Sequence, residues 1–269
     1  ATEADFQPFS TTEIDVSAGS EAFVANPPAD GPAFGSIGIL EWNDRQAEDG
    51  SGTPVELVEA DVTISGPFSA GIDEVYLRHL QLDGQCTASS GGNDFVATVV
   101  GGTATFPTLV RSDIDQSNGV VAPGDGLLST DDYYICVTAT GSDVLLSGQY
   151  SGEAIIDTDA STTETFSGDI DDVQYANGEI FDVSYFFGDG GGYAAFLNVV
   201  TGQSSGPVIV LSREDDGDLQ SGLLDTQQDA NTSVLYSAGD VDAALIANGG
   251  TTHYTDETTR GGLQVIVPS

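Results

Sequence analysis

Few residues of this sequence have the type and spacing that catalysis requires. Residues 202–206 read GQSSG, the pattern in which a nucleophilic serine occupies a sharp turn between a strand and a helix. A proline and the apolar run 208–211 follow directly, so the sequence predicts a strand where this motif needs a helix. The two histidines, His79 and His253, lie in a predicted strand and in a polar loop, and their spacing indicates neither a catalytic triad nor a metal pair. We therefore expect a protein that is not an enzyme.

Carboxylates are abundant, and two clusters of them stand near predicted turns. Because the chain has 43 Asp and Glu residues, pairs of acids suited to glycoside hydrolysis arise by chance and carry no information. The two clusters offer hard oxygen ligands of the kind that bind Ca²⁺ or monovalent cations, although neither fits the calcium loop of a helix–loop–helix hand. A hydrated acidic surface is the alternative, and no cofactor is required. The candidate ligands are Glu214, Asp215, Asp216, Asp218, Asp169 and Asp171.

The chain has two cysteines, Cys86 and Cys136, and no Cys-x-x-Cys motif. This pattern favours a single disulfide formed in an oxidising compartment over a metal site, with two buried free thiols as the alternative. In the chain-entropy model, closing such a loop stabilises the fold by about 4 kcal/mol.

Charge is the strongest compositional signal. There are 43 acidic residues and no lysine, and the net charge is −38. At molar salt the Debye length falls to about 3 Å, which screens the repulsion within such a surface. The composition resembles that of haloarchaeal proteins, with an acidic mesophilic secreted protein or a calcium-loaded adhesin as alternatives. Nucleic acid and anionic membranes are disfavoured as partners, because the basic residues are scattered singly. They are Arg45, Arg78, Arg111, Arg213 and Arg260.

Several features predict an extracellular location. The chain has no methionine and starts at Ala1, which indicates a processed end from which a leader was removed. Asn231 opens an Asn-Thr-Ser acceptor for N-glycosylation. No apolar run approaches the 18 or so residues that span a bilayer, so we expect no direct membrane insertion.

Two-residue alternation of apolar and polar side chains predicts an all-β protein of antiparallel sandwich or jelly-roll type, with about a dozen strands. We expect one hairpin within 133–150, tied by Cys136, and a second from 179–187 and 193–200. Gly101-Gly102 predicts a tight turn between two further strands. The one expected helix is 240–248, with Asp240 as its cap.

Three segments organise the chain. Residues 1–20 form an N-terminal arm and strand, and residues 21–156 form a β-sandwich. Residues 157–165 are rich in threonine and poor in apolar residues, which indicates a boundary or a long connection. Residues 166–269 form a second β-region, either a continuation of the same sandwich or a second small domain.

The N-terminal arm is too apolar to remain exposed in brine. It therefore either pairs within its own subunit or inserts into the open sheet of a neighbour. Its start, ATEADF, and the strand TEIDV resemble the secreted β-sandwich fibre subunits of the camelysin type. This resemblance implies a homopolymer that assembles by donating a terminal strand. The expected subunit contacts are Phe6, Phe9, Ile14 and Val16.

These observations predict a structural subunit of an extracellular assembly of a halophilic archaeon, either a pilus or filament or a surface layer. Its partners would be other copies of itself, joined through β-strand contacts. Two alternatives remain at this point. One is a capsid or decoration protein of a haloarchaeal virus, and the other is a secreted carbohydrate-binding module or hydrolase.

Overall fold

A computed structural model of the chain describes most of its residues. They are residues 2–8, 12–24, 31–44, 57–79, 86–89, 94–114, 132–187, 194–214, 219–248, 250, 254–255 and 260–268. Within them the protein is all-β, as predicted, with nearly all strand pairs antiparallel and a short helix near the C-terminus.

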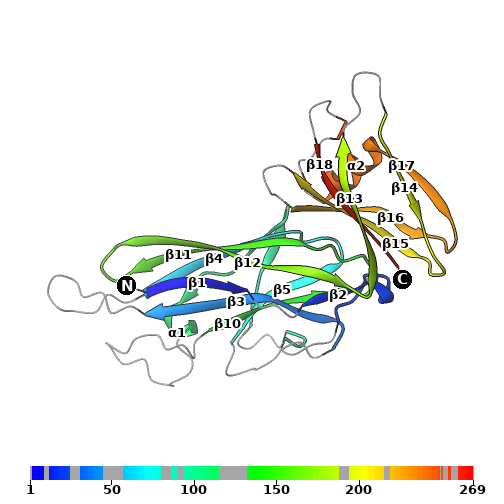
Figure 1. Cartoon of the computed structure of the whole chain (residues 1–269). Coiled ribbons are helices and arrows are strands. Elements are labelled where there is room, and N and C mark those ends of the chain that lie inside the picture. The colour runs from blue at the N-terminus through cyan, green and yellow to red at the C-terminus, as the bar shows by residue number, and fades with distance from the viewer. Residues whose placement is uncertain are drawn as a thin grey trace.

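Two sheets pack face to face in the N-terminal part of the chain (Figure 1). The first sheet has the order β1 (Thr2–Pro8), β3 (Phe34–Asp44), β10 (Tyr133–Ala139), β5 (Ile72–His79), β6 (Phe95–Val96). The second has the order β2 (Glu13–Asp15), β12 (Thr163–Ala176), β11 (Gly148–Thr158), β4 (Leu57–Ser65), β8 (Thr103–Thr105), β7 (Thr98–Val100), with β9 (Leu109–Val110) also paired to β4. Alternate side chains of both sheets fill one core, which contains Phe6, Leu40, Trp42 and Ile64.

A smaller set of strands follows from residue 178 and has a core of its own. Its larger sheet has the order β13 (Gly178–Phe187), β18 (Arg260–Pro268), β15 (Gly206–Glu214), β16 (Leu219–Gln228). The opposite layer is made of the pair β14 (Phe196–Val200) and β17 (Ser233–Ser237) with helix α2 (Ala238–Ala247). Val210, Leu245 and Val265 are buried between these layers. Figure 1 shows this smaller sandwich at one end of the larger one.

The two sandwiches meet through a third apolar cluster. Val16, from the 3-10 turn η1 (Val16–Ala18), and Leu146 contact Ile209 and Ile266 of the smaller sandwich. The Ser221 hydroxyl also donates a hydrogen bond to the Ser147 carbonyl oxygen. One face of the β13–β18–β15–β16 sheet therefore packs on the first sandwich, and its other face packs on its own core.

Both of the longer hairpins predicted from the sequence are wrong. β10 pairs with β3 and β5, and the chain then crosses to the opposite sheet, where β11 pairs with β4 and β12. β13 pairs with β18, whereas β14 pairs with β17. The predicted boundary at 157–165 is also wrong. Instead of separating two regions, this segment contains the turn of a hairpin formed by β11 and β12. The short turn at Gly101-Gly102 is confirmed: both glycines have positive φ, and β7 pairs with β8.

The N-cap of helix α2 lies three residues before Asp240, the cap predicted from the sequence. Ser237 is the N-cap, and its hydroxyl accepts a hydrogen bond from the Asp240 backbone N–H. The Asp240 carboxylate in turn accepts from the Ser237 backbone N–H at 2.7 Å, which completes a capping box. A second short helix, α1 (Arg111–Ile114), was not predicted.

The N-terminal strand lies within its own chain. β1 pairs with β3 along its whole length, and Phe6 is 4% exposed in the core of the first sandwich. Ile14 and Val16 are also buried in this chain, whereas Phe9 lies outside the described residues. A role of these side chains in contacts between subunits stays a prediction.

Candidate functional site

Strand β13 forms an open sheet edge in the part of the chain that the structure describes. It has the sequence GEIFDVSYFF and lies at the end of its sheet, where its one described strand partner is β18. Two adjacent apolar side chains on it remain half exposed, Ile180 at 50% and Phe181 at 49%. An open strand edge has a row of backbone N–H and C=O groups that can pair with another chain.

The strand register shows which face of the sheet each of these side chains occupies. Ile180 lies opposite Ile266, on the face that packs toward the first sandwich. Phe181 lies opposite Val265, on the face of the smaller sandwich's own core. The open edge of β13 is therefore bordered by apolar surface on both sides.

A hollow of about 380 Å³ lies next to this edge, on the face of Ile180. Arg213 of β15 lines it and is exposed, and its strand neighbour Gly262 has no side chain to fill the space. A Cβ atom at Gly262 would come no nearer than 3.9 Å to any atom around it. On the β13 side of the hollow, the Gln264 side-chain amide donates to the Asp182 carboxylate at 2.9 Å. The hollow thus combines an accessible guanidinium with open space beside the strand edge.

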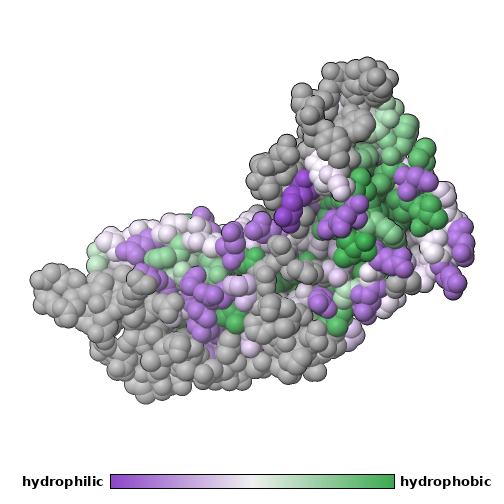
Figure 2. Space-filling view, in the orientation of Figure 1, coloured by the Kyte–Doolittle hydropathy of each residue, from purple (hydrophilic) through white to green (hydrophobic). Residues whose placement is uncertain are grey.

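The outer face of the β14–β17 pair is also apolar. Phe196, Val200 and Leu235 are between 55% and 60% exposed, and they lie on neighbouring positions of the two paired strands. Figure 2 shows hydrophobic residues gathered over the smaller sandwich, whereas the visible face of the larger sandwich is mixed with hydrophilic residues. Exposed apolar groups that lie together are typical of surfaces that another molecule covers.

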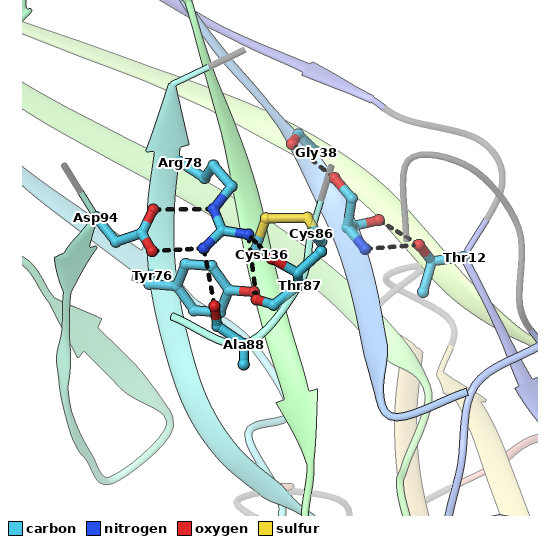
Figure 3. The surroundings of a disulfide bond; sticks show 10 residues. Thr12, Gly38, Tyr76, Arg78, Cys86, Thr87, Ala88, Asp94 and Cys136 are labelled. Carbon is cyan, nitrogen blue, oxygen red and sulfur yellow. Dashed lines mark hydrogen bonds and ion pairs between the residues drawn. A yellow bond between two sulfur atoms is a disulfide. The ribbon is translucent and has the colours of Figure 1, made fainter. Parts of the chain in front are cut away.

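The disulfide predicted from the sequence is confirmed and stabilises the first sandwich. Cys86 is joined to Cys136 of β10, and both residues are fully buried (Figure 3). Beside it, Arg78 binds Asp94 through Nε–Oδ1 at 2.9 Å and Nη2–Oδ2 at 2.5 Å. The Arg78 guanidinium also donates to carbonyl oxygens of the segment that follows Cys86, so this arginine is structural and unavailable to a partner.

The structure places the other candidate residues apart from this edge. His79 is fully buried in β5, where its ring packs edge-on against Tyr133 with centroids 5.3 Å apart. Residues 202–206 connect β14 to β15, so a strand follows them, as predicted, and the context of a nucleophile elbow is not met. Asn231 is exposed in the turn before β17, and its glycosylation stays a prediction. His253 lies outside the described residues.

The candidate cation ligands fall largely outside what the structure describes. Asp169 is exposed on β12, and Glu214 ends β15. The side chains of Asp171 and Glu214 and the residues Asp215, Asp216 and Asp218 are not among those described. Within the described part of the chain, no three metal-binding side chains come together. Cation binding at these clusters remains a prediction.

Comparisons with known proteins identify no family for this chain. No family model matches the chain, and no curated protein matches it. Among solved structures, the crystal structure of BcpA*(D312A), the major pilin subunit of Bacillus cereus, is similar with 10% identity and a TM-score of 0.29. The match covers 87% of this chain and 56% of that chain, so the chain spans about half the length of this pilin.

The sequence predicts the strand but not the site. Its pattern predicts a strand over 179–187 that pairs with residues 193–200, and this pairing would leave no open edge. The sequence does contain one signal. Ile180 and Phe181 are adjacent apolar residues, so in a strand they lie on opposite faces of the sheet, and both faces need an apolar neighbour to bury them.

The described residues contain no helix long and apolar enough to cross a membrane.

Proposed function

We propose that this protein is a structural subunit of an extracellular assembly, a pilus-like filament or a surface layer of a halophilic archaeon, and that it polymerises through β-strand contacts. The observation that carries the proposal is the open edge of β13, ten residues long and bordered by half-exposed Ile180 and Phe181. Natural proteins protect such edges with charges, prolines or covering segments, because an exposed apolar edge pairs readily with another chain. An apolar edge left open is therefore expected to be covered in an assembly.

The charge of the chain supports an assembly that forms in concentrated salt. Copies with a net charge of −38 repel each other strongly in dilute buffer. At molar salt, where the Debye length is about 3 Å, this repulsion is largely removed and short-range apolar and backbone contacts decide association. The Cys86–Cys136 disulfide fits an oxidising extracellular environment.

The side-chain chemistry also restricts how copies can be joined. The chain has no lysine, so lysine isopeptide bonds between copies cannot form. Its two cysteines are both used in the internal disulfide. The chain therefore offers neither a lysine nor a free cysteine for a covalent link, and strand pairing needs neither.

A second route to strand contacts is exchange of the N-terminal strand. β1 pairs with β3 in the same chain, and the same register can form between β1 of one copy and β3 of the next. Deletion of residues 1–17 tests this route. Loss of assembly with a folded monomer supports exchange, whereas normal assembly of the truncated chain leaves the β13 edge as the route.

The experiment that tests the proposed function is electron microscopy of the purified protein at molar salt and at about 0.1 M salt, with light scattering on the same samples. We expect uniform filaments or ordered sheets at molar salt and their dissociation at low salt. Monodisperse single particles at molar salt, at every protein concentration tried, would refute the proposal.

A further inference from the structure

The β13 edge is shaped to receive one extended strand. A strand added beside β13 would lie about 4.8 Å from it and would place successive side chains on alternate faces of the sheet. On one face these side chains would contact Ile180, and on the other they would contact Phe181. Added strands gain affinity from backbone hydrogen bonds and gain specificity from the pockets that receive their side chains.

The pocket available here is the hollow that contains Arg213. Cross-strand partners share a face, and the register pairs Ile180 with Ile266, Gln264 with Leu211, and Gly262 with Arg213. Ile266, Gln264 and Gly262 alternate along β18, so Ile180 and Arg213 belong to the same face. A side chain that enters the hollow from the open edge therefore passes over β13 near Ser184 and approaches the guanidinium across Gly262 of β18.

The positive charge of Arg213 indicates which kind of side chain the hollow binds. Of the five arginines, Arg78 is buried in its pair with Asp94, whereas Arg213 is exposed in the hollow, on β15, two strands in from the open edge. A cationic partner would find carboxylates over the whole chain and would gain nothing from Arg213. An acidic strand, in contrast, finds an opposite charge in Arg213, beside the Asp182 carboxylate, which already accepts a hydrogen bond from Gln264. A second copy of this chain, with its 43 acidic residues, presents such strands.

We propose that the open edge of β13 is the acceptor site for a strand of a second copy of this chain, and that Arg213 binds a carboxylate of that strand across Gly262. This inference rests on the proposed function and assigns its contact. Arg213 is then the residue that selects an acidic strand and fixes its register, because a guanidinium binds a carboxylate through two parallel hydrogen bonds.

Matched variants separate this contact from general effects of charge and apolar surface. Arg213→Gln removes the cation, and its control, Gln149→Glu on exposed β11, makes the same change in net charge. Gly262→Val fills the hollow where the structure leaves room for a Cβ. Phe181→Ser removes an apolar contact at the edge, and its control is Val58→Ser on β4, a strand paired on both sides where Val58 is 47% exposed. Each variant is first shown to keep the thermal unfolding temperature of the parent.

The readout is the critical concentration for assembly at molar salt, measured by light scattering, together with hydrogen exchange of the β13 amides before and after assembly. We expect Arg213→Gln, Gly262→Val and Phe181→Ser each to raise the critical concentration by about tenfold or more, equivalent to about 1.4 kcal/mol per contact. Both controls should stay near the parent value, and the β13 amides should exchange more slowly in the assembled protein.

Two results overturn the inference in distinguishable ways. If the parent protein assembles, but the three variants assemble as their controls do and the β13 amides remain unprotected, the acceptor site is wrong while the structural function stands. If the parent protein does not assemble at molar salt, the proposed function fails and this inference falls with it.

Discussion

The contact between Phe6 and Gly152 gives the sharpest test of how the N-terminal strand is held. Gly152 lies in β11 of the opposite sheet, directly beneath the Phe6 ring of β1. A Cβ atom built on Gly152 would lie 2.3 Å from both Cδ1 and Cε1 of Phe6, a separation that real Cβ contacts do not show. Gly152→Ala therefore forces the ring out of its position, and β1 shifts with it.

The magnitudes follow from the burial of this ring. Phe6 is 4% exposed, so Phe6→Ala should reduce the free energy of unfolding by about 3 to 5 kcal/mol. Gly152→Ala inserts a methyl group into a filled core, which costs about 2 kcal/mol. In the Phe6→Ala background the ring is absent, so the same Gly152→Ala change should cost less than about 0.5 kcal/mol. The double-mutant cycle should therefore show a coupling of about 1.5 kcal/mol or more.

The assay is urea denaturation at molar salt, because urea carries no charge and leaves the screening unchanged. Trp42, the single tryptophan, is buried in the same core, so its fluorescence reports the unfolding of this sandwich. Gly202→Ala is the matched control: no atom lies within 4 Å of its Cβ position, and its stability should match the parent. If Gly152→Ala costs the same with and without the Phe6 ring, the two residues are not coupled and this account of β1 is refuted.

Three further predictions concern the disulfide, the helix cap and the buried phenols. Replacing Cys86 and Cys136 together by serine should lower the free energy of unfolding by about 4 kcal/mol, because the disulfide closes a loop of 50 residues. Trp42 fluorescence in urea measures this loss of stability, and an unchanged denaturation midpoint would contradict the prediction. Ser237→Ala should cost about 1 kcal/mol of stability in thermal unfolding. Hydrogen bonds from Ser237 hold the pKa of Asp240 below its usual range. The cap's contribution to stability should therefore persist above about pH 4 and fade as the pH drops through the folded-state pKa of Asp240. A stability cost of Ser237→Ala that is independent of pH would count against the capping box. Burial, assisted by Asp225, raises the pKa of Tyr236 to about 12. This phenol therefore ionises near pH 10 in the unfolded chain but stays neutral there in the folded protein, so stability should fall between about pH 10 and about pH 12. Tyr236→Phe should reduce this fall in alkaline denaturation curves.

Local signals in the sequence were sufficient for features that form within a few residues. The two-residue alternation identified most strands, because it reflects burial of one sheet face wherever the partner strand lies. Gly101-Gly102 identified its hairpin, because positive φ at two adjacent residues defines that turn. The helix near the C-terminus was also found, but its cap was misplaced: Ser237 and Asp240 form a Ser-x-x-Asp capping box that the sequence already contained.

Strand partners and the open edge were decided by tertiary structure alone. The runs 133–150 and 179–200 each have two strands with glycine in the sequence between them, yet in both cases the second strand belongs to the opposite layer. Alternation is satisfied by any partner that covers the same face, so it cannot choose between an adjacent strand and a distant one. β18, more than seventy residues away along the chain, is the partner of β13.

By itself, then, the sequence determined the all-β class, the cysteine pair and the extreme acidity of the chain, because composition and short-range periodicity depend on neighbouring residues. Only the tertiary structure decided that Phe6 is buried in its own chain, that Ile180 and Phe181 border an open edge, and that Arg213 lines a hollow beside that edge. These positions depend on which strands pair across the whole chain. Such pairing is fixed by long-range packing of two cores, which no window of adjacent residues contains.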